Sequence, residues 1–237
     1  MIALVALTAA LGALWAYLRG GVLPAGWTPL RRGPARRLWR QCAWLGGTTV
    51  AVLALTGRLN ALVALPPELL PARAAAIRWA GGTIVVDAGA LWVVGGIMLG
   101  GAMLALAERW RGRPLGLGDV EGLMPRTPAG LLWSVPLSIG AGVNEEAFFR
   151  LLLPIAIAGV TGSALAGFAV ATALFGIAHR YQGWRGVAAT AVSGALLAFV
   201  YLLTGQLWAA IALHIAIDLN ALVLRPVLSG RVRWPGR

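Results

Sequence analysis

No charged residue interrupts the stretch Val187-Ala-Ala-Thr-Ala-Val-Ser-Gly-Ala-Leu-Leu-Ala-Phe-Val-Tyr-Leu-Leu-Thr204, which nearly reaches the ~20 apolar residues that cross a bilayer as a helix. Ile2 to Leu18 is a second such run. Apolar residues make up 59% of the 237 residues and charged residues only 12%, against about 25% in a soluble domain. The sequence therefore predicts an integral membrane protein. Because lipid offers the backbone no hydrogen-bonding partner, we expect an all-α polytopic bundle.

Hydropathy divides the chain into spans and loops. We expect seven spans, with approximate bounds 2–18, 42–57, 82–105, 130–158, 163–180, 187–204 and 207–224. This predicts an N-terminal three-helix membrane region with a cytoplasmic linker over 1–128, a helix bundle over 129–225 and a basic cytoplasmic tail over 226–237. The stretch 106–128, rich in Arg, Gly and Pro, is expected to be a mobile part of the linker.

The basic residues indicate orientation rather than a nucleic-acid partner. All twenty are Arg, and they lie between the apolar runs instead of along one helix face. With seven spans, sixteen fall on one side and only Arg58, Arg73 and Arg78 on the other, while Arg150 lies within a span. Since Arg accumulates in cytoplasmic loops, we expect the N-terminus outside and the C-terminus inside. The lone cysteine excludes an internal disulfide.

Ionisable side chains inside spans are rare here and concentrated. Each costs about 2.5–3.5 kcal/mol at mid-bilayer on insertion scales, so each indicates a functional site. We assign Glu68, Glu108, Asp119 and Glu121 to loops, and Asp87 to the start of the third span. Six groups remain, all in the last four spans: Glu145, Glu146, Arg150, His179, His214 and Asp218.

Helix geometry separates the two adjacent glutamates. Glu146 and Arg150 are four residues apart with the acid first, so they share a face and are expected to form an ion pair. Glu145 is rotated by about 100° from that face and has no partner in its own helix. An unpaired carboxylate in an apolar site suits proton transfer, so Glu145 is the candidate general base or acid. The alternative is that Glu145 pairs with His179 only for packing.

Two further pairs repeat the spacing of four. Phe175 and His179 share one helix face, and His214 lies one turn before Asp218. A water between Glu145 and His179 would lose its proton and attack a carbonyl, and His214 would donate a hydrogen bond to the resulting oxyanion. This predicts a peptide hydrolase without a serine or cysteine nucleophile.

Three motifs in order resemble the CAAX-prenyl-protease and bacteriocin-processing (CPBP) family of intramembrane glutamic endopeptidases. They are Glu-Glu-x-x-x-Arg, Phe-x-x-x-His and His-x-x-x-Asn/Asp, and the likeness covers about 129–225. The resemblance implies that Glu145 and His179 activate water, that Glu146 pairs with Arg150, and that His214 and residue 218 hold the oxyanion. We expect no cofactor and no bound metal.

The third motif ends in Asp218, where eukaryotic members carry Asn. An ionised carboxylate cannot donate a hydrogen bond and would repel an oxyanion. Either Asp218 is protonated or it holds His214 as an imidazolium, as a triad carboxylate does, and we favour the second. The Arg-only, Ala- and Gly-rich composition indicates a bacterial protein of the cytoplasmic membrane. The expected substrate is then a peptide or membrane protein, reached from the cytoplasmic side.

Other functions use the same residues. Two His and the carboxylates would serve as ligands of a Zn²⁺-dependent membrane peptidase, although the spacing is not that of a His-Glu-x-x-His helix. A proton-coupled transporter is another alternative, but the sequence lacks the inverted repeat expected of one. A haem site would need His179 and His214 to face one another. A non-catalytic membrane scaffold or immunity protein is the remaining alternative.

Overall fold

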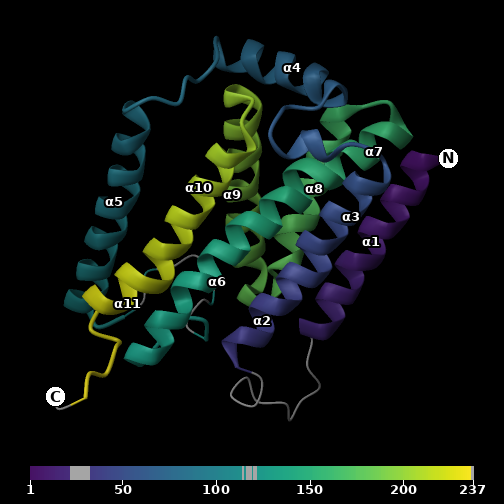
Figure 1. The fold of residues 1–237 in the computed structure, drawn as a ribbon. Helices are drawn as coiled ribbons and strands as arrows, with labels where there is room; N and C mark the ends of the chain where they lie inside the picture. Colours follow the sequence, from purple (N-terminus) through teal and green to yellow (C-terminus); the bar gives the residue numbers. More distant parts are fainter. Residues whose placement is uncertain (22–32, 114, 116–118, 120–121, 236–237) are drawn as a thin grey trace.

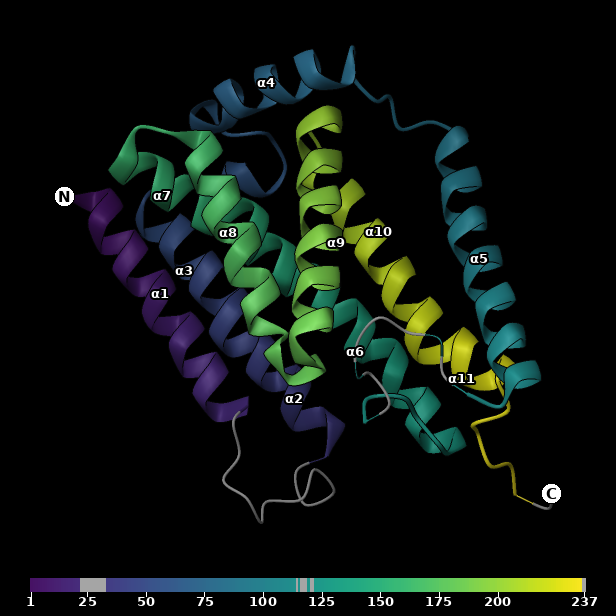
Figure 2. The ribbon, with the colours of Figure 1, turned by 180° about the vertical axis from the view of Figure 1, so that it is seen from behind.

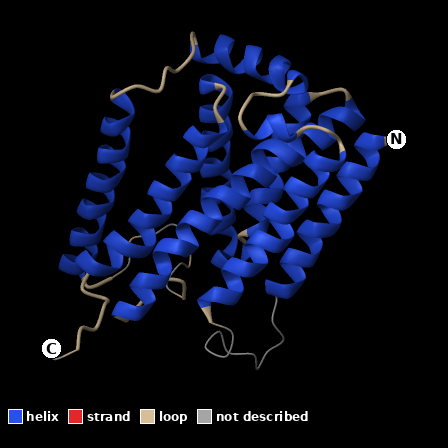
Figure 3. Cartoon of the chain, viewed as in Figure 1, coloured by secondary structure: helices blue, strands red, loops and turns tan. Residues whose placement is uncertain are grey.

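Helices form every regular element in the described part of the computed structural model, which covers residues 1–21, 33–113, 115, 119 and 122–235 (Figure 3). No strand occurs there, so the predicted all-α class is confirmed. Three residues of the predicted basic segments, Arg31, Arg32 and Arg237, lie outside the described residues.

The described chain contains α-helices together with shorter 3-10 and π-helical elements. In chain order they are α1 (Ile2–Gly21), α2 (Pro34–Arg40), η2 (Gln41–Gly46), α3 (Gly47–Leu55), η3 (Leu59–Leu62), η4 (Pro67–Leu69), α4 (Leu70–Ala80), α5 (Gly89–Arg111), α6 (Pro128–Glu146), η5 (Ala147–Leu152), α7 (Leu153–Thr161), α8 (Ala164–Ala178), η6 (Arg180–Gln182), α9 (Gly183–Thr204), α10 (Leu207–Leu219), η7 (Asn220–Leu224) and α11 (Arg225–Leu228).

Three of these elements, η2, η5 and η7, are π-helical turns. Each lies between two α-helical segments without a break, so α2–α3, α6–α7 and α10–α11 are continuous rods. A π turn widens the helix locally, and such turns are frequent at functional sites. All three lie next to residues of the candidate site described below.

The predicted spans match this architecture except in the third. The spans at 2–18, 42–57, 130–158, 163–180, 187–204 and 207–224 coincide with α1, η2–α3, α6–α7, α8, α9 and α10–η7. In the third, residues 82–88 are not helical, and α5 continues to Arg111 before Gly112 ends it with φ +66°. The first part of the predicted 106–128 linker is therefore helix, because good helix formers fill it up to this glycine cap.

Glu108 was assigned to a loop, and this was wrong. It lies in the last turns of α5, is buried, and forms an ion pair with Arg225 of α11, where Arg225 Nε lies 3.0 Å from Glu108 Oε2. Leu115 N–H also donates to this carboxylate. A buried charge needs such partners, and this pair joins α5 to the end of the α10–α11 rod.

Helix α4 was not predicted as an element. It carries Arg73 and Arg78, which interrupt any apolar run, so hydropathy alone places it in a loop. Its small residues Ala72, Ala75 and Ala76 are buried, and α4 contacts α8 and α9. Figure 1 shows that it lies across one end of the bundle.

The helices form one bundle with α6, α9 and α10 near its middle (Figures 1 and 2). α1 and α3 lie along one side, and α5 lies at the opposite edge, where it contacts α10, η7 and α11. The N-terminus of α1 and helix α11 lie at opposite ends of the bundle (Figures 1 and 2).

Four described helical stretches are long and apolar enough to cross a membrane: Ile2–Arg19, Gly89–Arg111, Arg180–Thr204 and Leu207–Leu228. The apolar stretches Gln41–Leu55 and Ala164–Ala178 are shorter. Large apolar side chains point out of the bundle, such as Trp92 with 85% of its surface exposed. A soluble protein would bury such groups, so these surfaces face lipid. Seven crossings and the N-out orientation stay predictions.

Candidate active site

The centre of the site is the close approach of α6 to α10. A Cβ on Gly142 would lie 2.5 Å from Cγ1 of Ile215, so only glycine allows the two helices to pack this tightly. One turn further along α6, Glu146 Oε1 lies 2.7 Å from His214 Nδ1 of α10. Glu146 is fully buried, and His214 is almost so. Sequence reasoning did not predict this bond, because it joins residues 68 positions apart.

Glu146 also makes the ion pair that the sequence predicted. Its Oε2 lies 3.1 Å from Arg150 Nε, and both side chains are at most 1% exposed. The contact is electrostatic rather than a well-aligned hydrogen bond, since neither atom meets hydrogen-bond geometry. Glu146 therefore lies between the Arg150 guanidinium and the His214 imidazole, and both groups offset the cost of burying its charge.

Residues of α8 and α9 hold the Arg150 side chain. Its Nη2 donates to the carbonyl oxygen of Gly194 on α9 at 3.2 Å, and its Cζ lies 4.1 Å from the centre of the Phe175 ring. A Cβ on Gly194 would come within 2.8 Å of that ring. The lack of a side chain at residue 194 thus makes room for the guanidinium and for the aromatic face that stabilises it.

Phe175 is the aromatic hub of the site. Its ring centre lies 4.8 Å from that of His179 and 6.0 Å from that of His214, the latter edge to face. Phe149 contacts its other side at 5.1 Å. The apolar ring therefore sets the positions of both imidazoles and of Arg150.

His179 stands where α8 ends, and its backbone leaves the helical region. Its Nδ1 lies 2.8 Å from the carbonyl oxygen of Phe175. A carbonyl oxygen only accepts, so Nδ1 donates, and the neutral ring keeps the lone pair on Nε2. The spacing of four that placed Phe175 and His179 on one face thus also fixes the imidazole tautomer.

Glu145 has quite different surroundings from its neighbour. It is 5% exposed, and its Oε1 accepts a hydrogen bond from Gln41 Nε2 at 3.2 Å. Tyr17 of α1 and Tyr181 also lie within electrostatic range of this carboxylate. Among the described residues, Glu145 forms no salt bridge and no direct hydrogen bond to His179. This disfavours the alternative that Glu145 pairs with His179 only for packing.

Asp218 follows His214 by one turn of α10. Its Oδ2 lies 3.8 Å from His214 Nε2, which is ion-pair range but beyond a hydrogen bond. The Asp218 side chain is 27% exposed, so this carboxylate is the most accessible acid of the motifs. His214 thus lies between Glu146, in close contact, and Asp218, in loose contact.

Gln41 is the residue that sequence reasoning missed. It begins η2 at the edge of the second predicted span, and only ionisable groups were counted inside spans, so an amide passed unnoticed. The rod that carries it packs against α6, where Asn144 Nδ2 lies 3.4 Å from Cys42 Sγ. A lone carboxamide at the start of an apolar run was the available signal.

The described residues contain no group of three or more His, Cys, Asp and Glu side chains arranged to hold a metal ion. Glu146 is already engaged by Arg150 and His214, as shown above. Both imidazoles contact the Phe175 ring, and Asp218 lies 3.8 Å from His214, but among the described residues these groups form no ligand set. What the arrangement offers is an acid with a neutral partner, an imidazole with a fixed tautomer and a second imidazole flanked by carboxylates.

Comparison with protein-family models matches residues 127–220 to the type II CAAX prenyl endopeptidase Rce1-like family. The match runs from the N-cap of α6 to the start of η7 and includes all seven residues singled out from the motifs. This confirms the resemblance for that part of the chain. No curated protein and no solved structure matches the chain.

Proposed function

Residues 127–220 match a family of CAAX prenyl endopeptidases, and on this basis we propose that the chain is an intramembrane glutamic endopeptidase. In this proposal, Glu145 and His179 activate a water molecule that attacks a peptide carbonyl. His214, with Asp218 beside it, stabilises the oxyanion. Glu146, Arg150 and Phe175 hold these groups in place.

The contrast between the two adjacent glutamates carries the proposal. Glu146 is bound to a guanidinium and an imidazole at 3.1 and 2.7 Å, so its charge is satisfied and its position fixed. Glu145 is equally enclosed but has only the neutral amide of Gln41 as a hydrogen-bond partner among the described residues. Among the described residues, no salt bridge engages Glu145, so its carboxylate is the one placed to act on a water molecule. The general base is therefore Glu145.

His179 completes the water-activating pair. Its Nδ1–H is engaged by the Phe175 carbonyl, so the lone pair of Nε2 is available to orient the water by accepting a hydrogen bond. Glu145 takes the other water proton as the oxygen attacks the carbonyl carbon. The protonated Glu145 then gives that proton to the leaving amine when the C–N bond breaks. The balance is one water consumed, with one carboxyl and one amine end released.

His214 suits the oxyanion role because of its two neighbours. Nδ1 donates to Glu146, so donation from Nε2 as well requires the imidazolium form. Asp218 is close enough to favour that charge but too far to occupy the Nε2 hydrogen. That hydrogen is then free to meet an oxyanion, while the Asp218 carboxylate acts through the imidazole and not on the substrate.

The substrate that fits such a site is a peptide or a segment of a membrane protein. His179 lies at the end of α8 toward the Arg-rich loops, so a bilayer-embedded chain would reach the site from the side predicted to be cytoplasmic. We place the protein in the cytoplasmic membrane of a bacterium. Nucleic acid is not expected as a partner.

The test is a peptidase screen on detergent-purified protein beside Glu145→Gln and His179→Ala. We expect kcat/KM to fall by about 10²–10⁴ in each variant, the usual range for losing a general base. Thr49→Ala is the matched control, because Thr49 is buried but bonds only within its own helix. It should cleave normally.

Two outcomes would contradict the proposal. Equal activity of the wild type and the Glu145→Gln and His179→Ala variants would remove the hydrolase assignment and favour a scaffold or immunity role. Loss of wild-type activity in a strong chelator, with recovery on adding Zn²⁺, would favour the metal-dependent peptidase instead.

A further inference from the structure

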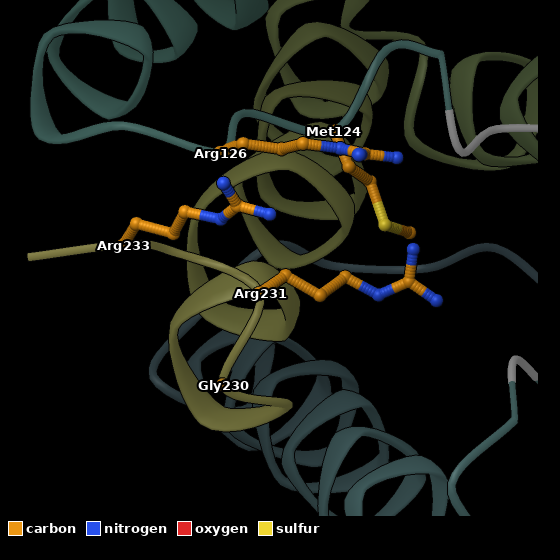
Figure 4. Close-up of a pocket in the computed structure, with 5 residues that line it drawn as sticks. All are labelled: Met124, Arg126, Gly230, Arg231 and Arg233. Atoms are coloured by element: carbon orange, nitrogen blue, oxygen red, sulfur yellow. The ribbon is translucent and has the colours of Figure 1, made fainter.

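A cavity of about 270 Å³ lies at the foot of the bundle, away from the candidate active site. It is lined by Met124, Arg126, Gly230, Arg231 and Arg233 (Figure 4). The geometry points to a binding site for a phosphate group, presented by the headgroup of an anionic lipid or by a free phosphate. This inference does not depend on the proposed function.

The end of the chain folds back to build this cavity. Gly230, with φ +76°, turns the backbone after α11, and Arg231 N–H donates to the Pro226 carbonyl at 3.0 Å. Val232 is then buried, and Arg233 N–H donates to the carbonyl of Arg126 at 2.9 Å. These contacts bring arginines more than 100 positions apart in sequence to one place.

Arg126, Arg231 and Arg233 surround the cavity, and the Met124 side chain lies between the ends of Arg126 and Arg231 (Figure 4). Positive side chains that line one cavity make it attractive to an anion. The described residues that line the cavity include no carboxylate. The oxygens of Glu108, an acid on which Arg231 acts electrostatically, are bound by Arg225 and by the backbone N–H of Leu115. Among the described residues, neither Arg126 nor Arg233 forms a salt bridge.

Guanidinium forks match phosphate oxygens in pairs, which makes arginine the preferred residue for this group. The volume lies just below the ~300 Å³ at which sites for drug-sized ligands begin, so it suits a headgroup rather than a larger molecule. The cavity also lies at the Arg-rich end of the bundle, where an inner leaflet would supply anionic headgroups. Trp234, partly exposed beside it, is typical of that interface.

The test is native mass spectrometry of the full-length protein with phosphatidylglycerol, phosphatidylcholine or inorganic phosphate. Arg126→Gln and Arg233→Gln should each weaken phosphatidylglycerol binding about fivefold, and more strongly together. Arg126→Lys, which keeps the charge but not the fork, should lose less. Arg78→Gln on α4, at the other end of the bundle, is the matched control and should bind as the wild type does. Thermal unfolding verifies that every variant is folded.

Comparing phosphatidylglycerol with inorganic phosphate distinguishes a lipid headgroup from a free phosphate as the ligand. Binding of phosphatidylglycerol that inorganic phosphate does not displace identifies a lipid headgroup, whereas binding and competition by inorganic phosphate identify a free phosphate. Equal loss in Arg78→Gln would show that only total charge matters and would overturn the site. Binding of neither probe, or wild-type affinity in the folded double variant, would overturn it as well.

Discussion

The helices α5 and α9 have the same mean hydropathy, 2.0, but opposite roles in the fold. In an apolar stretch of 18 residues taken from each helix, only 6% of the α5 residues are buried within the protein, against 39% for α9. α5 lies at the edge of the bundle, whereas α9 supplies the backbone carbonyl that holds Arg150. Apolar composition places a helix in the membrane, but it does not tell whether the helix faces lipid or surrounds a site.

The N-terminal region is nevertheless more than a lipid-facing shell. Its α2–η2 rod packs against α6, and Gln41 reaches the carboxylate of Glu145. The family match begins only at residue 127, so this contact comes from outside the matched segment. The two parts of the chain differ in burial but share one site.

The largest expected effect concerns the buried ion pair. Glu146→Ala leaves Arg150 buried without its counter-charge, and we expect the free energy of unfolding to fall by about 3–5 kcal/mol. Denaturant unfolding in detergent measures this loss. Adding Arg150→Met should restore much of it, because the uncompensated charge is gone. An unaltered stability of Glu146→Ala would mean that the pair does not hold the site together.

A glycine comparison separates the edge helix from the central one. In Gly194→Ala the new methyl meets Phe175 and Arg150, so we expect a loss of about 1–3 kcal/mol from overpacking, together with loss of activity. In Gly96→Ala on α5 nothing lies within 4 Å, so stability should stay the same or rise slightly. Thermal unfolding of both variants decides the matter, and equal shifts would contradict the assigned packing.

A smaller effect is expected where the N-terminal region meets the site. Gln41→Leu removes one hydrogen bond to the Glu145 carboxylate, worth about 1.5–3 kcal/mol because the acceptor is charged, so kcat should fall roughly ten- to a hundredfold while KM is unchanged. Steady-state kinetics in parallel with Thr49→Ala, a change on the same rod, tests this. A change in KM alone would indicate that Gln41 binds substrate instead of positioning Glu145.

The smallest change concerns Asp218. Asp218→Asn should keep partial activity, since the residue acts only through His214. With one carboxylate fewer beside it, the imidazolium form of His214 is less favoured, and the alkaline side of the pH–rate profile should move to lower pH. An unchanged profile would count against this role.

The motifs could be predicted from sequence because each spans one helical turn. The Glu146–Arg150 pair and the Phe175–His179 pair depend on local spacing, and both occur as expected. Glu108 was missed because its partner Arg225 is 117 residues away, and α4 because its arginines hide a buried alanine face. Gln41 was missed because its amide is neutral and is therefore not counted among the ionisable groups.

The sequence by itself determined the all-α class of the protein, the approximate bounds of six apolar helical segments and the residues with chemical character, since hydropathy and helical periodicity are local properties. Only the tertiary structure decided which partners those residues have. Glycines at helix crossings let Glu146 reach His214 and Arg150 reach Gly194, and the packing of η2 on α6 brought Gln41 to Glu145. Such contacts depend on how closely two helices approach one another, and no pattern within a single helix encodes that distance.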